Sequence, residues 1–271
     1  MSVVRTTLRT FWKWPLHSAG TAAAAPLKHC VSIVQRLRLG VEWTYVWSHF
    51  PATCRMTSTF PAAVIFDMDG LLIDSERAWR EAFFIAAADL GYQFSQEDFL
   101  NLVGRPWAAN RITLRDRIGL ACKADHIQSI WVRCHNDLKD TIGLKFGAIE
   151  LLDLLEDLRI PRAICTSSDR QEVLYYLDRH DLRGRFDTIV AAGDYTRGKP
   201  APDPFLRAAE VLGVKPETCL ALEDSYNGVR AAAAAGMRTI MIPDLLPATD
   251  EMRALCHLVM DDLRGVCDLL I

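Results

Sequence analysis

The chain has 271 residues, of which half are hydrophobic and about a quarter are charged, with a formal net charge of −3. This length allows one large or two moderate domains with a proper core, so folding requires neither disulfides nor a structural metal. The modest charge indicates no polyanion-binding surface, and no apolar run approaches the ~18 residues of a membrane span. We therefore expect a soluble globular protein that binds neither nucleic acid nor membrane.

The eight cysteines show no C-x-x-C spacing, and several lie inside apolar runs such as Ala163-Ile164-Cys165. This pattern is typical of reduced, buried thiols in a reducing compartment. The predicted location is the cytoplasm.

Residues 1–55 differ in character from the rest of the chain. They hold seven Lys or Arg against a single acid, Glu42, and four of the seven tryptophans. Three interpretations stay open: translation that begins at Met56, an organelle transit peptide, which would make the location organellar, or a folded accessory element. In each case we place residues 1–55 outside the fold.

The first predicted strand follows this leader and ends in charge. Ala62 to Phe66 is an apolar run of strand length, and Asp67, Asp69 and Gly70 come directly after it. In an open α/β sheet the carboxyl ends of strands bind ligands, so both carboxylates would meet at a site. The alternative is an Asp-Gly turn whose carboxylates satisfy local backbone donors.

A helical region follows, from Ser75 to about Ile142. Its first helix ends at Gly91, and Ser95 is the expected N-cap of the second. Two further helices are predicted over 107–118 and 124–142.

From Gly147 onward helices and short apolar strands alternate. Helices are predicted over 148–158, 170–179, 203–212 and 227–235, and strands over 162–166, 186–191, 218–222, 239–242 and 258–260. This alternation predicts an α/β fold, in which a parallel sheet carries helices on both faces.

Three more segments carry residues suited to a phosphate site. Thr166 and two serines end a strand, where hydroxyls and free backbone N–H groups form an anion site, although they could also be ordinary N-caps. Lys199 lies in a rigid Gly/Pro loop, and Glu223 and Asp224 follow another apolar strand. Seen alone, the lysine could be a solvated loop residue and the acids could stabilise a helix N-terminus.

These four segments together resemble the motifs of the haloacid dehalogenase superfamily of phosphohydrolases. The matching strings are Asp67-Met68-Asp69-Gly70, the Thr166 segment, Gly198-Lys199-Pro200 and Glu223-Asp224, and the resemblance covers about residues 62–262. It implies a Rossmann-like core of residues 62–76 and 144–271, with a helical cap of residues 77–143.

The resemblance also implies roles for the matching residues. Asp67 would be the nucleophile that forms an aspartyl-phosphate, and Asp69 the general acid and base. Thr166, the Ser167 backbone and Lys199 would bind the phosphate.

The same likeness implies one cofactor, Mg²⁺. Its ligands would be the Asp67 carboxylate, the Asp69 backbone carbonyl and Asp224, with Glu223 bound directly or through water. The predicted activity is Mg²⁺-dependent hydrolysis of a small phosphomonoester, such as a sugar phosphate, by a monomer or weak dimer.

Three other functions are alternatives to this hydrolysis. Dehalogenases of the superfamily lack the second aspartate, so Asp69 argues against that chemistry. β-Phosphoglucomutases share all four motifs, but Trp79 and Trp107 stand where the mutase has a cap histidine and a cap arginine. Intact Asp67 and Asp69 count against a non-catalytic regulatory module.

The substrate is not fixed by these motifs, since the cap selects it. Arg105 and Trp107, in the loop that opens the third helix, are the tentative substrate residues of the cap.

Overall fold

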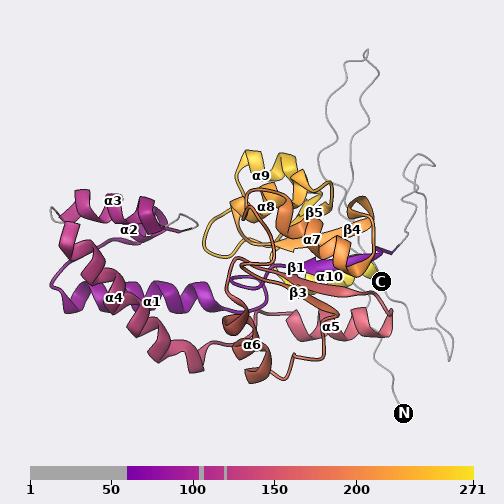
Figure 1. Cartoon of the computed structure of the whole chain (residues 1–271), viewed down its shortest axis with the longest axis horizontal. Helices are drawn as coiled ribbons and strands as arrows, with labels where there is room; N and C mark the ends of the chain where they lie inside the picture. The colour runs from indigo at the N-terminus through magenta and orange to yellow at the C-terminus, as the bar shows by residue number, and fades with distance from the viewer. Residues whose placement is uncertain (1–59, 104–106, 119–120) are drawn as a thin grey trace, which may run out of the picture. The chain divides into compact units, whose positions relative to one another are not determined.

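The computed structural model describes residues 60–103, 107–118 and 121–271, so the predicted leader, residues 1–55, lies outside the described part. A six-stranded parallel sheet, with strand order β3-β2-β1-β4-β5-β6, forms its centre (Figure 1). The strands are β1 (Ala63–Phe66), β2 (Arg162–Cys165), β3 (Thr188–Val190), β4 (Cys219–Glu223), β5 (Arg238–Met241) and β6 (Leu258–Val259). The central strand β1 is apolar and buried along its whole length because both faces of the sheet are covered.

The helices cover the two faces of this sheet in two layers (Figure 1). One layer holds α5 (Ala148–Asp157), α6 (Arg170–Arg179) and α10 (Leu263–Leu270), and the other holds α7 (Asp203–Leu212) and α8 (Tyr226–Ala234). Alternate residues of β1 point to opposite layers: Val64 and Phe66 belong to the first cluster, Ala63 and Ile65 to the second. This arrangement confirms the predicted Rossmann-like α/β core.

Four helices follow the first strand, as the sequence predicts. They are α1 (Ser75–Asp89), α2 (Gln96–Leu100), α3 (Trp107–Ile118) and α4 (Ala121–Leu138), and the short 3-10 turn η1 (Lys139–Thr141) follows α4. Ser95 caps α2, since its Oγ accepts a hydrogen bond from the Asp98 amide at 3.1 Å while the Asp98 carboxylate accepts one from the Ser95 amide at 2.8 Å. None of the described helices has the length and apolar character needed to cross a membrane.

The inserted helices share an apolar cluster of their own. Phe83 of α1, Phe99 of α2, Leu114 of α3 and Ile127 of α4 are all at most 2% exposed and pack together. Burying such side chains stabilises a fold by about 1.5–3 kcal/mol each. This separate cluster supports our proposal that the insertion is a cap unit.

The segments that enter and leave the insertion run side by side. Ile73 and Leu144 form an antiparallel bridge, and the Asp74 amide donates to the Gly143 carbonyl at 3.0 Å. The inserted helices are therefore joined to the core through two paired segments of chain.

Two short C-terminal helices were not predicted. They are α9 (Asp250–Leu255) and α10, and with six and eight residues they show too few turns for a clear apolar period. Their N-caps were the available signal: Thr249 accepts from the Met252 amide and Asp262 from the Gly265 amide. The predicted third strand of the sheet is also shorter than expected, and a 3-10 turn, η2 (Pro216–Thr218), precedes β4.

Candidate active site

The candidate site lies at the carboxyl ends of three neighbouring strands. Asp67 follows β1, Thr166 follows β2, and Glu223 is the last residue of β4. The register aligns Phe66 with Ile164 on one side and with Leu222 on the other, so the residues that follow them meet at one edge of the sheet. The parallel order of the strands therefore gathers residues that lie far apart in the sequence.

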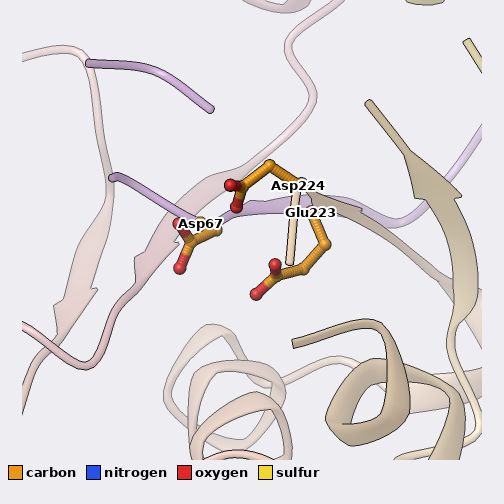
Figure 2. Close-up of side chains that lie close together, drawn as sticks. All are labelled: Asp67, Glu223 and Asp224. Atoms are coloured by element: carbon orange, nitrogen blue, oxygen red, sulfur yellow. The ribbon is translucent and has the colours of Figure 1, made fainter. Parts of the chain in front are cut away.

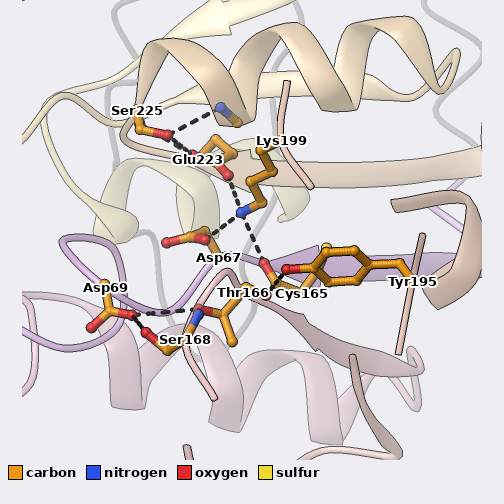
Figure 3. Close-up of polar contacts among 10 residues, drawn as sticks. Asp67, Asp69, Cys165, Thr166, Ser168, Tyr195, Lys199, Glu223 and Ser225 are labelled. Atoms are coloured by element: carbon orange, nitrogen blue, oxygen red, sulfur yellow. Dashed lines mark hydrogen bonds and ion pairs between the residues drawn. The ribbon is translucent and has the colours of Figure 1, made fainter. Parts of the chain in front are cut away.

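Lys199 connects these strand ends (Figure 3). Its ammonium donates to the Asp67 carboxylate, to Glu223 Oε1 at 2.5 Å and to the Cys165 carbonyl at 2.9 Å. The lysine side chain is only 5% exposed. A buried ammonium with three oxygen partners is a fixed positive charge beside Asp67.

Three carboxylates lie close together at these strand ends (Figure 2). Asp67, Glu223 and Asp224 each offer an oxygen within 4.8 Å of the others. Hard divalent cations such as Mg²⁺ prefer oxygen ligands of this kind. The donor set of these three residues therefore fits a magnesium ion.

The carboxylate of Glu223 is also oriented by the start of α8. The amide and the hydroxyl of Ser225 donate to its Oε2 at 3.1 and 3.0 Å, while Oε1 accepts from Lys199. Both oxygens of Glu223 thus have protein partners.

Two glycines make room for these acids. A Cβ on Gly228 would lie 1.8 Å from Glu223 Oε1, and a Cβ on Gly70 would lie 2.4 Å from Asp224 Oδ2. Gly70 also has a φ of 77°, a left-handed conformation that glycine adopts without strain. The sequence motif drew attention to Gly70, but Gly228 emerges only from the fold.

Hydroxyl groups hold the Asp69 carboxylate apart from the acidic cluster (Figure 3). Ser75 Oγ donates to its Oδ1 at 2.8 Å, and Ser168 Oγ donates to its Oδ2 at 2.6 Å. Thr166 Oγ1 lies 3.4 Å from the same oxygen. The Asp69 side chain thus faces Thr166 and Ser168 rather than joining the three clustered acids.

Burial and the ion pair between Asp67 and Lys199 shift the pKa values of these two groups in opposite directions, whereas burial and neighbouring charge act together on Asp224. Burial raises the pKa of Asp67, and the Lys199 ammonium opposes that rise. Burial would lower the pKa of Lys199, but the charges of Asp67 and Glu223 outweigh it and the pKa is raised. Burial, together with Asp67 and Glu223, raises the pKa of Asp224. The lysine stays charged, and a second cation would favour the ionised form of all three acids.

Most of the residues singled out from the sequence lie together here. Asp67, Asp69, Thr166, Lys199, Glu223 and Asp224 surround one edge of the sheet, and Ser167 is exposed in the loop between β2 and α6. Arg105 lies outside the described residues. Trp107 is partly buried against the Phe83 cluster, so its contact with substrate stays a prediction.

Several residues that hydrogen-bond to the site residues were not predicted from the sequence. Ser75, Ser168 and Ser225 bind the carboxylates, and the Tyr195 hydroxyl donates to the Thr166 carbonyl at 3.2 Å. Ser75 and Ser168 lie within the motifs themselves, so their hydroxyls were a signal. Tyr195 carried no local signal, because its contact depends on the folding of a distant loop.

Comparison with known proteins gives the family. The family model of haloacid dehalogenase-like hydrolases matches residues 64–242. A phosphorylated carbohydrates phosphatase of Thermotoga maritima is 32% identical over 182 residues, which are 66% of this chain and 83% of that protein. Hexitol phosphatase B of Escherichia coli K12 is 33% identical over 219 residues, covering 75% of this chain and 96% of that protein.

Solved structures agree with this family. CbbY from Rhodobacter sphaeroides, in complex with phosphate, has a TM-score of 0.62 and 27% identity, covering 76% of this chain and 96% of that one. A hydrolase of family IA, variant 3, from Entamoeba histolytica has a TM-score of 0.63 and 26% identity, with 77% and 97% covered. The matched region contains all four strand-end motifs described above. The chain therefore belongs to the haloacid dehalogenase-like hydrolases.

Proposed function

We propose that this hydrolase is a Mg²⁺-dependent phosphatase that removes phosphate from a small phosphorylated metabolite. One observation carries the proposal: buried Lys199 lies against Asp67 and Glu223 at the same sheet edge where three hydroxyls hold Asp69. This arrangement supplies a nucleophile, a proton-transfer group and a fixed positive charge within one site. The class of enzyme is that of phosphoric monoester hydrolases, in keeping with the family.

In the first chemical step an Asp67 oxygen attacks phosphorus. A bond forms between that oxygen and phosphorus while the ester bond to the leaving oxygen breaks, which gives an aspartyl-phosphate. Lys199 keeps the Asp67 carboxylate in place and remains positively charged beside the transferring group.

Asp69 moves the protons in both steps. Its protonated carboxyl gives a proton to the departing alkoxide, and the resulting carboxylate later takes one from the water that hydrolyses the aspartyl-phosphate. Inorganic phosphate leaves and Asp67 is regenerated. The hydroxyls of Ser75 and Ser168 keep Asp69 within reach of this position.

The equatorial phosphate oxygens require positive charge and hydrogen-bond donors. Thr166, the Ser167 backbone and Lys199 supply these from the chain. The Asp67 carboxylate, the Asp69 backbone carbonyl and Asp224 would hold Mg²⁺, and Glu223 would contact it directly or through water. When bound, Mg²⁺ would neutralise charge on the phosphoryl group.

The proposed substrates are phosphorylated carbohydrates or related phosphomonoesters. The relatives named for hexitol phosphates and phosphorylated carbohydrates support this class. Phosphoryl transfer of the β-phosphoglucomutase kind is the weaker alternative, because Trp79 stands at the position where the mutase has a histidine. The Trp79 ring stacks on His135, with ring centroids 3.5 Å apart.

The free cysteines among the described residues support a reducing compartment, for which we propose the cytoplasm. They are Cys134, Cys165, Cys219, Cys256 and Cys267.

Hydrolysis of p-nitrophenyl phosphate with and without Mg²⁺ tests the proposed function. We expect turnover to stop in a chelator and to return when Mg²⁺ is added. The Asp224→Asn variant should need a higher Mg²⁺ concentration for half-maximal rate, because it loses a charged ligand. Undiminished turnover in chelator would exclude the metal dependence, and absence of turnover on every phosphomonoester would favour a binding module.

A further inference from the structure

A pocket of about 340 Å³ lies where α1, the end of α4 and the start of α6 meet. Trp79 and His135 line it on the cap side, and Gln171 and Glu172 line it on the core side. None of these residues belongs to the four motifs. The pocket has room for a group of roughly monosaccharide size, so its chemistry bears on the substrate.

Two residues that line the pocket connect it with Asp69, which is not itself a lining residue. Ser168, whose hydroxyl donates to Asp69, is followed directly by Asp169, which also lines the pocket. The pKa of Glu172 is raised first by burial and next by the charge of Asp69, so the two carboxylates lie within electrostatic reach. Since Asp69 is placed to protonate the leaving oxygen, the leaving group would extend into this pocket.

The charges around the pocket sum to negative. Asp169 and Glu172 are acidic, and Lys139 is the opposing cation, with its Nζ 3.6 Å from Glu172 Oε1. His135 adds no charge at neutral pH, because burial, helped by Lys139, lowers its pKa to about 4. A second phosphate would bring a charge of about −1.5 to −2 toward this negative wall.

The uncharged groups suit hydroxyls. His135 is 1% exposed, and its Nε2 has no hydrogen-bond partner among the described residues. The exposed Gln171 side chain offers both a donor and an acceptor, and the Trp79 ring supplies an apolar wall. A buried nitrogen without a partner is costly, so a hydroxyl that reaches it after a small adjustment of the stacked rings would be favoured.

We propose that this pocket receives the uncharged, polyhydroxylated part of a monophosphate and excludes substrates that carry a second phosphate on that part. The inference rests on the proposed function and adds specificity to the same site. It also separates this chain from a structural relative, since R. sphaeroides CbbY was solved in complex with xylulose-1,5-bisphosphate. Glu172 and Gln171 are the specificity-determining residues of the pocket in this chain.

Three substrates and three variants test the proposal. The substrates are fructose 6-phosphate, fructose 1,6-bisphosphate and p-nitrophenyl phosphate, and the variants are Glu172→Gln, Gln171→Ala and, as a matched control, Glu81→Gln. Glu81 is exposed on α1 and does not line the pocket.

The wild-type protein should prefer the monophosphate over the bisphosphate in kcat/KM by about tenfold or more, since like charges at this range repel. Glu172→Gln should reduce that preference about tenfold through the KM for the bisphosphate. Gln171→Ala should raise the KM for fructose 6-phosphate several-fold. In both variants the kinetics with p-nitrophenyl phosphate should change less than about twofold, and Glu81→Gln should change none of the three substrates.

Equal use of the mono- and bisphosphate by the wild-type protein, or parallel changes on all three substrates, would overturn the inference. Binding to Asp67→Asn, measured by calorimetry, separates it from the proposed function because no turnover is needed. Suppose that the wild-type protein hydrolyses no substrate. If the Asp67→Asn variant still binds fructose 6-phosphate more tightly than the bisphosphate, and if adding Glu172→Gln to that variant removes the difference, the inference stands without the hydrolase mechanism. If p-nitrophenyl phosphate is hydrolysed and no such difference in binding exists, the inference alone is wrong.

Discussion

Individual side chains in this site owe their properties to their immediate partners. Lys199 is nearly inaccessible to solvent, yet it stays charged because Asp67 and Glu223 accept from it. Removing one partner from such a buried pair costs about 3–5 kcal/mol, since the other charge is then uncompensated. Asp69 is also well supplied with partners, but its partners are neutral hydroxyls. Two aspartates separated by one residue therefore have different electrostatic environments, which supports different chemical roles.

Substitution of each aspartate should separate these roles. If Asp67 is the nucleophile, Asp67→Asn removes the attacking oxygen and no covalent intermediate should form. If Asp69 is the general acid and base, Asp69→Asn removes proton transfer, which typically contributes about 10² to 10⁴-fold to rate, while its backbone carbonyl would still be available to the proposed Mg²⁺. The first step should suffer less with p-nitrophenyl phosphate than with a sugar phosphate, because p-nitrophenolate needs little protonation.

Mass spectrometry after rapid acid quench gives the measurement. We expect a phosphoryl adduct on Asp67 in Asp69→Asn and none in Asp67→Asn. An adduct on Asp69, or near-normal turnover of Asp67→Asn, would show that the two roles are assigned wrongly.

His135 predicts a dependence of stability on pH. Its pKa falls from 6.5 to about 4 on folding, so the unfolded chain takes up a proton at a higher pH than the folded one. The free energy of unfolding should be unaffected by this group above pH 6.5 and should decrease as the pH falls toward 4. The loss should be at most about 3 kcal/mol.

Thermal or urea unfolding between pH 4 and 7.5 checks this expectation. The His135→Leu variant should show a flatter pH dependence than the wild-type protein, while His126→Gln, an exposed histidine of the same helix, should follow the wild-type curve. Identical slopes for all three proteins would show that His135 titrates normally.

At the scale of elements, the start of α8 shapes the acidic cluster. Ser225 is the N-cap of α8 and accepts from the Gly228 amide at 3.1 Å, while it donates to Glu223. The absence of a side chain on Gly228 lets the Glu223 carboxylate lie against the first turn of this helix. The helix N-terminus thus positions an acid that ends the preceding strand, and the macrodipole favours its negative charge there.

Gly228→Ala should therefore damage the site although alanine favours helix. A Cβ 1.8 Å from Glu223 Oε1 forces the carboxylate away from Lys199, and overpacking of this kind costs about 1–3 kcal/mol. We expect a lower melting temperature, weaker binding of Mg²⁺ and a lower kcat/KM.

Gly184→Ala is the matched control, because nothing lies within 4 Å of a Cβ at that position. Calorimetric unfolding and Mg²⁺ titration of both variants give the comparison. A Gly228→Ala protein stabilised by about 1 kcal/mol, the usual gain in a helix interior, would mean that Glu223 moves aside freely.

At the scale of the whole molecule, the parallel sheet places the ends of β1, β2 and β4 at one edge, and the inserted helices begin directly after the first of these strands. Lys145, which follows the insertion, donates to Asp244 at 2.7 Å, so an ion pair links the returning segment to the loop after β5. The inserted helices, which we propose to be a cap, are thereby attached next to the candidate site, where they would affect which substrates enter.

The Met56 boundary gives a prediction at this scale. If residues 1–55 contribute nothing to the fold, a chain shortened to begin at Met56 should express in soluble form with the melting temperature and kcat of the full chain. Calorimetry and p-nitrophenyl phosphate hydrolysis on both proteins provide the comparison. A melting temperature lower by more than a few degrees would assign the segment a structural role.

The sequence by itself determined the α/β class, the order of most elements and the residues of the four motifs. Local patterns carry this information, because an apolar run that ends in Asp67 or Glu223 predicts both a buried strand and a carboxylate at the carboxyl end of that strand. The short helices α9 and α10 were missed because their periodicity extends over too few turns. Only the tertiary structure decided which hydroxyls bind Asp69, why Gly228 must be a glycine, and that His135 lies fully buried against Trp79. The Ser168–Asp69 and Trp79–His135 contacts join residues separated by long stretches of chain. The geometry of all these contacts depends on how the helices pack on the sheet rather than on any local pattern.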